Sequence, residues 1–301
     1  NPANSGLTMW VISLAAWTPH YRAKLKLVAL PSINAALAHA TGPIQFILHT
    51  DDPADFADVH FAGDVIIRLV EPDSRALYQS YGNCDRMAIE LAPEDSFIAL
   101  LTSDIIVNVE FFANAERRFA EGRRAIIGSA ARTLADLSDI PVGLKARDLL
   151  DWSFDPVRRH PVTSGCWYGQ GKNLVSWMTY WEGPHGITGH AFHLHPFAAV
   201  NDRALYFQRE TCDLDLLDRF TKDEIYVACD PDEFAWAEIS GLEKSIPQMA
   251  QPVSIGSIVS WARNHSTPLQ RHLFSHRIVV QGTGDDHLDE GPANEILRIL
   301  G

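Results

Sequence analysis

The sequence has 301 residues, with 25 Lys and Arg against 38 Asp and Glu, and its formal net charge is −13 when the 13 histidines are neutral. This surplus of acid disfavours a nucleic acid as partner, because binding to phosphates requires a surplus of cations. It also disfavours attachment to anionic lipid through basic residues. Hydrophobic residues make up 46% and charged residues 21%, which is typical of a folded globular chain.

The cysteines and the apolar runs restrict the location of the protein. The four cysteines lack Cys-x-x-Cys spacing, so they indicate neither a zinc site nor a disulfide framework, and we expect a reducing, cytoplasmic location. No apolar run reaches the ~18–20 residues that span a bilayer, so no transmembrane segment is predicted. The sequence begins without Met and without a signal-peptide pattern, which indicates a trimmed start or an excised domain.

The first part of the chain alternates apolar runs with helical patterns. Short apolar runs bounded by Gly, Pro or Asp predict strands over residues 8–15, 44–49, 64–70, 97–101 and 124–128. Apolar residues at intervals of three and four predict helices over 19–40, 74–91 and 109–121. Pro31 is expected to bend or break the first helix. Alternation of this kind implies parallel strands joined by crossover helices, which is an α/β fold.

The second part of the chain is less regular. Residues 134–188 are rich in tryptophan, and we expect helices over 145–151 and 174–180. The expected elements that follow are a short apolar run at 191–200, an acidic segment at 211–218, a strand at 224–228, helices to the C-terminus, and an acidic loop at 281–291. The length allows one large α/β domain with an appended lobe, which we favour over two separate domains.

The most informative feature is an acid at the carboxyl end of an apolar strand. The run that begins at Phe97 ends in Thr102-Ser103-Asp104. Ligands of open α/β sheets bind at this edge, and a carboxylate there can hold a divalent cation that offsets a diphosphate. The alternative is that Asp104 starts a turn or caps the next helix. Thr50-Asp51 ends the second strand in the same way, and side chains there can form hydrogen bonds with a ribose or a base. The alternative is that this segment only forms the turn after the strand.

Two further groups of residues are candidates for metal binding and acid–base chemistry. His193 and His195 lie on one face if their segment is extended, and neutral imidazole is a good ligand for Mn, Co or Zn. Their alternative role is as satisfied core residues. Two acidic pairs each adjoin an apolar run: Asp213 with Asp215, and Asp230 with Asp232. Their carboxylates are candidate general bases or cation ligands. The alternative is an acidic surface.

Weaker candidates complete the predicted site. Asp85 and Arg86 lie early in the predicted helix 74–91 and would face the crevice, unless they form a helical salt bridge. Arg132 follows the strand at 124–128 and would meet a phosphate or a sugar, although surface arginines are common. The sequence contains no G-x-G-x-x-G after its first strand, no P-loop motif and no G-x-S-x-G, which disfavours dinucleotide enzymes, P-loop NTPases and α/β-hydrolases.

On these residues the N-terminal half resembles the GT-A, or nucleotide-diphospho-sugar transferase, fold of glycosyltransferases. The resemblance covers roughly residues 7–135, and its most specific part is the strand that ends at Asp104. In that family an Asp-x-Asp motif holds a metal ion on the donor diphosphate. Here Thr102 replaces the first acid, so only Asp104 matches a metal ligand of that motif. The fold that the resemblance implies is a Rossmann-like, mostly parallel sheet flanked by helices, with a mainly helical C-terminal addition. Residues 1–200 would form the core, and 201–301 the acceptor side.

The resemblance also implies a function. The expected protein is a glycosyltransferase that moves a sugar from a UDP- or GDP-sugar to a glycan or small-molecule acceptor, assisted by Mn or Mg. The implied metal ligands are Asp104, His193 and His195. The implied catalytic residues are Asp213, Asp215 and Asp232. The implied nucleotide-sugar-binding residues are Thr50, Asp51, Asp85, Arg86, Thr102, Ser103 and Arg132.

Two other functions fit the same pattern. One is a metal-dependent nucleotidyltransferase or hydrolase built on a similar sheet. The other is a non-catalytic sugar- or nucleotide-binding module, which the replacement of the first acid by Thr102 permits. Donor turnover, measured with and without Mn or Mg, separates the catalytic functions from the binding module. The identity of the product then separates the two catalytic functions.

Overall fold

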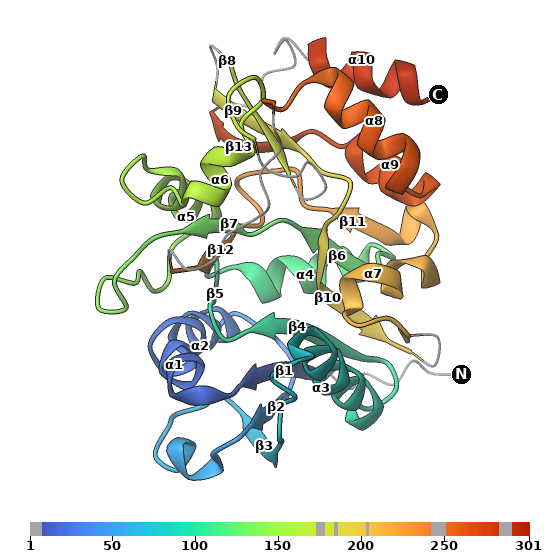
Figure 1. Cartoon of the computed structure of the whole chain (residues 1–301). Coiled ribbons are helices and arrows are strands. Elements are labelled where there is room, and N and C mark those ends of the chain that lie inside the picture. The colour runs from blue at the N-terminus through green and yellow to red at the C-terminus, as the bar shows by residue number, and fades with distance from the viewer. Residues whose placement is uncertain (1–7, 173–177, 184–185, 203–204, 242–250, 283–290) are drawn as a thin grey trace. The chain divides into compact units, whose positions relative to one another are not determined.

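A computed structural model describes residues 8–172, 178–183, 186–202, 205–241, 251–282 and 291–301 (Figure 1). The chain divides into two compact units. Unit 1 comprises Asn1–Ile127, Leu137–Gly143 and Pro196–Tyr226, and unit 2 comprises Gly128–Asp136, Leu144–His195 and Val227–Gly301. Within the described residues, no helix is both long enough and apolar enough to cross a bilayer.

Unit 1 is built on a sheet whose strand order is β11-β6-β10-β4-β1-β2-β3. Its strands are β1 (Trp10–Ala16), β2 (Ile44–Thr50), β3 (Asp64–Leu69), β4 (Ser96–Thr102), β6 (Ala125–Gly128), β10 (His195–Asn201) and β11 (Ile225–Val227). The pairs β1–β2, β1–β4 and β2–β3 are parallel, whereas β10 is antiparallel to β4. The five strands predicted in the first part of the chain and the strand predicted at 224–228 are therefore present, and the parallel pairing near the N-terminus is confirmed.

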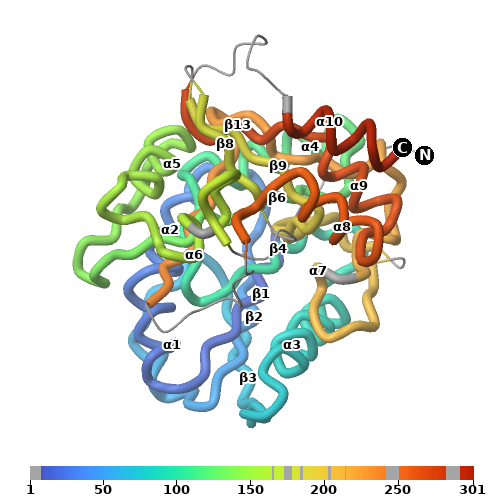
Figure 2. The backbone as a smooth tube through the Cα atoms, turned by 45° about the horizontal axis from the view of Figure 1, so that its top comes forward, coloured from blue at the N-terminus to red at the C-terminus, as the bar shows by residue number. Residues whose placement is uncertain are grey.

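Helices cover both faces of the β1–β4 sheet, which explains why all seven residues of β1 are buried. Figures 1 and 2 show α1 (Thr18–Lys24) and α2 (Leu30–Leu37) on one side of β1–β3 and α3 (Leu77–Leu91) on the other. The chain crosses from β1 to β2 in one direction and from β3 to β4 in the opposite direction. Because both crossovers are right-handed in such folds, their helices must lie on opposite faces.

Pro31 does not break the first helix. The turn before it widens into a π-helical segment, η1 (Leu25–Ala29), and the helix then continues as α2. A proline lacks the N–H of an α-helical bond, and its ring clashes with the carbonyl four residues earlier. The wider π turn accommodates both features without ending the helix.

The remaining elements of unit 1 are short, apart from one helix. They are η2 (Pro53–Phe56), β5 (Ile105–Val107), α4 (Phe111–Ala120), α7 (Cys212–Asp215), η3 (Leu216–Arg219) and η4 (Lys222–Glu224). The backbone N–H and carbonyl of Val107 in β5 both bond the Ser32 hydroxyl of α2, at 2.9 Å each. This pair of bonds fixes the chain directly after the end of β4.

His49 of β2 is a fully buried histidine whose two ring nitrogens have no hydrogen-bond partner among the described residues. Burial, with a smaller contribution from the charge of Arg68, lowers the pKa of His49 to about 4. In the unfolded chain His49 is protonated below about pH 6.5, whereas in the folded protein it is protonated only below about pH 4. Stability must fall as the pH falls through this window.

We therefore expect the protein to lose stability in mild acid because of His49. Between pH 7 and pH 5 the wild type should lose about 2 kcal/mol more free energy of unfolding than His49→Leu does. Urea unfolding at the two pH values measures the difference. An equal loss in both proteins would show that this imidazole is not held neutral in the folded state.

Unit 2 combines two small sheets with helices. Its elements are β7 (Ala131–Thr133), α5 (Ala146–Phe154), α6 (Pro161–Gly165), β8 (Thr179–Gly183), β9 (Gly186–His190), β12 (Trp236–Ile239), α8 (Ile255–His265), α9 (Pro268–Phe274), β13 (Ile278–Gly282) and α10 (Gly291–Leu300). β8, β9 and β13 form an antiparallel sheet in the order β13-β9-β8, and β12 is parallel to β7. The helices enclose a core that includes Phe192, Ile258, Phe274 and Ile296.

Several elements of unit 2 differ from the prediction. The helix expected over 174–180 is wrong at Thr179 and Tyr180, which begin β8; residues 173–177 lie outside the described part of the chain. The hairpin β8–β9, the helix α6 and the strands β7, β12 and β13 were not predicted. Gly186 at the start of β9 has a φ of +136°, and a Cβ there would lie 1.9 Å from the carbonyl oxygen of Gln281 on β13, so only glycine permits the approach of these two strands.

Candidate functional site

The parallel strands of unit 1 end at one edge of the sheet, which contains a topological switch point. From β1 the chain passes to β2 and β3 on one side, and α3 then returns it to β4 on the other side of β1. Ligands of open α/β sheets bind at the carboxyl ends of the strands that flank such a point. The candidate site is therefore the edge formed by Trp17 after β1, Asp51 after β2, Val70 after β3, and Asp104 after β4.

A cavity of about 210 Å³ lies at this edge. It is lined by the ends of β1 and β3 and by α3, through Trp17, Val70, Glu71, Pro72, Ser80, Asn83, Cys84 and Met87. Apolar and aromatic walls with a few polar groups are typical of small-molecule sites. Because such sites usually measure ~300–1,000 Å³, this cavity can hold one part of a ligand, such as a base.

Trp17, which lines the cavity, packs against a second aromatic residue, Tyr81. The rings of Trp17 and Tyr81 lie 4.3 Å apart between centroids, and Trp17 packs in one cluster with Ala15 and Cys84. Burial raises the pKa of Tyr81, and the charge of Asp104 raises it further, which places this phenol near that carboxylate. Burial also raises the pKa of Cys84 to about 12, so its thiol is protonated at neutral pH and is not a nucleophile.

Asp104 is only 4% exposed and already has partners on both carboxylate oxygens. Its Oδ1 accepts a hydrogen bond of 2.8 Å from the Thr102 hydroxyl. Its Oδ2 lies 3.6 Å from Nζ of Lys24, a residue that is itself 3% exposed. The neighbouring Ser103 is fully buried, and its hydroxyl has no hydrogen-bond partner among the described residues.

The donor set around Asp104 in unit 1 does not fit a metal ion. A divalent cation there would compete with the buried ammonium of Lys24 for the same carboxylate. His193 falls in unit 2, and His195 is the last residue of the same unit 2 segment although it also begins β10. The set of Asp104 with these histidines stays a prediction. Within the described residues, no cluster of three or more His, Cys, Asp or Glu side chains is arranged to hold a metal ion.

Asp51 lies at the predicted position, in an ion network with the first helix. It accepts a hydrogen bond from the backbone N–H of Thr18 at 2.9 Å and from Arg22 at 2.5 Å, and Arg22 also bonds Asp55 at 2.9 Å. Partial burial raises the pKa of Asp51, but the bonds from Thr18 and Arg22 outweigh it and the pKa is lowered. Thr50 is fully buried and is not among the residues that line the cavity.

Asp85 and Arg86 connect α3 to two different parts of unit 1. Asp85 accepts a hydrogen bond of 2.9 Å from the Ser13 hydroxyl of β1. Burial raises the pKa of Asp85 to about 7, against the effect of that bond and with a smaller contribution from the charge of Asp213. Arg86 donates a hydrogen bond of 2.9 Å to the backbone carbonyl of Arg209 and so holds the segment before α7 against α3.

Close packing brings the acidic segment 211–218 to α3. A Cβ at Gly82 would lie 1.9 Å from the carbonyl oxygen of Glu210, so only glycine permits this approach. Asp213 accepts a hydrogen bond from the Thr211 hydroxyl and lies near Asp85. Sequence spacing did not reveal this contact, because more than 120 residues separate the two segments.

The three predicted catalytic acids have different surroundings. Asp215 accepts the backbone N–H groups of Gln208 and Arg209, at 2.9 and 3.4 Å, and so closes a loop. Asp232, in unit 2, forms two hydrogen bonds of 2.6 Å with Arg147, which lower the pKa of Asp232. Asp213 is therefore the acid among them that lies beside another predicted site residue.

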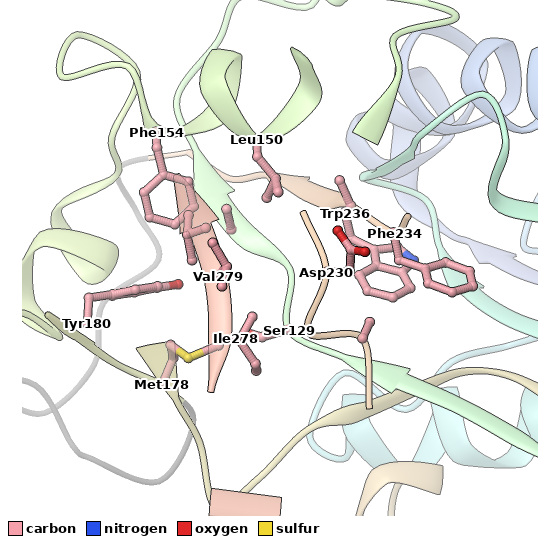
Figure 3. Close-up of a pocket in the computed structure, with 14 residues that line it drawn as sticks. Ser129, Leu150, Phe154, Met178, Tyr180, Asp230, Phe234, Trp236, Ile278 and Val279 are labelled. Carbon is pink, nitrogen blue, oxygen red and sulfur yellow. The ribbon is translucent and has the colours of Figure 1, made fainter. Parts of the chain in front are cut away.

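Two predicted residues of unit 2, Arg132 and Asp230, have different surroundings. Arg132 on β7 pairs with Glu238 at 3.2 Å. Figure 3 shows a pocket of unit 2 with Asp230 and Trp236 among its lining residues. Its volume of about 20 Å³ has room for about one water molecule. This cavity is too small for a sugar acceptor, so the acceptor site stays a prediction.

Two residues of the site were not singled out from the sequence. Trp17 directly follows β1 and was not recognised as the wall of a cavity. Lys24 had a recognisable signal, since it lies four residues before Val28 and eight before Ser32, both buried. Helical spacing thus puts this lysine on the inward face, where a charged side chain requires a partner.

No protein-family model matches the sequence, and no curated protein matches it. Among solved structures, S. aureus TarS 1–349 in complex with UDP-GlcNAc is similar over 98% of this chain and 71% of that chain, at 12% identity and a TM-score of 0.42. A second S. aureus TarS structure matches 45% of this chain and 23% of its own, at 14% identity and a TM-score of 0.31. This chain thus spans less than a quarter of the longer TarS structure.

Proposed function

We propose that the chain is a glycosyltransferase that binds a nucleotide-diphosphate sugar at the carboxyl edge of the unit 1 sheet. The observation that carries this proposal is the cavity at the β1–β4 switch point, which has Trp17 in its wall and Asp104 at the end of the neighbouring strand. Trp17 is 2% exposed and gives the cavity an aromatic edge against which a base can pack, and the amide N–H groups of Asn83 suit the polar edge of the base. The expected donors are UDP- and GDP-sugars.

The chemistry assigned to the site follows from the charges of sugar transfer. As the bond to the diphosphate breaks, positive charge develops at the anomeric carbon and negative charge on the leaving group. The acceptor hydroxyl loses its proton to a base when the configuration inverts, and we assign that role to Asp213. The acceptor would be a glycan or a small molecule. Assistance by Mn or Mg stays a prediction, and no step is assigned to it.

Blocking the cavity tests the donor site. Asn83 is exposed on α3 and lines the cavity, whereas Glu90 is exposed on the same helix and does not. Asn83→Trp should weaken the affinity for UDP or UDP-GlcNAc by at least about tenfold, because the indole fills the space of the base. Glu90→Trp should bind as the wild type does.

Isothermal titration with UDP, GDP and UDP-GlcNAc measures these affinities, with thermal melting as the control for folding. Unchanged nucleotide affinity in a folded Asn83→Trp protein would contradict the site. Binding without release or transfer of the sugar would favour a non-catalytic binding module. Release of a nucleoside monophosphate with the sugar phosphate would favour a hydrolase, and transfer of the nucleotidyl group to an acceptor would favour a nucleotidyltransferase.

A further inference from the structure

A buried lysine lies where the resemblance to the GT-A fold puts a metal ion. Nζ of Lys24 is 3.6 Å from Oδ2 of Asp104, and the two residues are 3% and 4% exposed. Lys24 ends α1, directly before the π-helical segment, and its ammonium lies 5.6 Å from the centre of the Tyr21 ring. The cation is thus held between a carboxylate and an aromatic face, both in unit 1.

The other groups near Asp104 do not complete a metal site in unit 1. Thr102 stands where an Asp-x-Asp motif has its first acid, and its hydroxyl donates a hydrogen bond to Asp104. Asp85, another carboxylate near this edge, accepts its hydrogen bond from Ser13 instead. A hard divalent cation prefers several oxygen ligands, and replacing a buried ammonium also requires that the ammonium find a new partner.

We propose that Lys24 supplies at Asp104 the positive charge that a divalent cation would supply, so that this carboxylate binds no metal ion. The consequence for substrate, which rests on the proposed function, is that nucleotide-sugar binding in unit 1 does not depend on divalent metal. Lys24 acts here as a positioning residue: it neutralises Asp104 and holds that carboxylate at the end of β4.

Binding of Mn²⁺, followed by its electron paramagnetic resonance signal, tests this assignment without an activity assay. The wild type and Asp104→Asn should bind Mn²⁺ equally, with and without UDP. Lys24→Met keeps most of the side-chain stem but removes the cation that competes for Asp104. With that carboxylate, the Thr102 hydroxyl and water as oxygen ligands, the variant should bind Mn²⁺ at least about tenfold more tightly than the wild type. Adding Asp104→Asn to Lys24→Met should abolish that gain.

Two results would overturn the assignment. One is a wild-type Mn²⁺ site that Asp104→Asn removes. The other is a Lys24→Met protein that is folded by thermal melting and gains no Mn²⁺ affinity. If Lys24→Met does not fold, Lys24→Gln, which keeps a hydrogen-bond donor, takes its place. Failure of UDP to bind under any condition would contradict the proposed function but would leave the Mn²⁺ comparison decisive for Lys24.

Discussion

Asp213→Asn is expected to lower the turnover of sugar transfer by about 10²–10⁴-fold while leaving nucleotide-sugar affinity unchanged. The amide keeps the size of the side chain and the hydrogen bond from Thr211, but it cannot take a proton from an acceptor hydroxyl. Steady-state kinetics with a radiolabelled UDP-sugar measures the turnover, and isothermal titration measures the affinity.

Asp215→Asn is the matched control for this prediction. Its carboxylate accepts two backbone N–H groups, so its loss should loosen the loop and lower the melting temperature, with turnover nearly unchanged. Equal turnover in Asp213→Asn and the wild type would reject Asp213 as the base. A large loss in Asp215→Asn alone would move the assignment to that residue.

Lys24→Met is expected to lower the free energy of unfolding by about 3–5 kcal/mol, because it leaves the buried Asp104 carboxylate without its cation. The double variant Lys24→Met/Asp104→Leu removes both charges and should recover most of that loss, since apolar residues of similar volume replace many buried ion pairs at little cost. Urea unfolding of the single and double variants measures the two energies.

The coupling energy between Lys24 and Asp104 shows whether the two residues interact directly or stabilise the fold independently. Recovery in the double variant supports a direct interaction. A loss in the double variant equal to the sum of the losses in Lys24→Met and in Asp104→Leu alone would contradict the interaction and would also weaken the inference that Lys24 replaces a metal ion.

The sequence predicted the sheet of unit 1 more accurately than the elements of unit 2. β1, β2 and β4 are short apolar runs between turn residues, and this pattern is specific when both faces of a strand are buried. β8 and β13 were missed because partly exposed short strands give only a weak periodic signal. The signal that was present is the sequence Gly-Pro-His-Gly at 183–186, because a Gly-Pro pair favours a turn.

The candidate site divides in the same way. The position of Asp104 beside the switch point followed from the strand in front of it, because the end of a strand is a local property of the sequence. The partners of that acid did not follow, since Lys24 is 80 positions away and meets it only in the folded chain. The contact of α3 with the segment of Asp213 depends in the same way on tertiary packing at Gly82.

A crystal structure of the protein with UDP bound tests the central proposal most directly. The proposal predicts the uracil against Trp17 in the cavity beside α3, and the diphosphate near the end of β4 where Asp104 lies. A nucleotide bound elsewhere on the molecule, with this cavity empty, would contradict it.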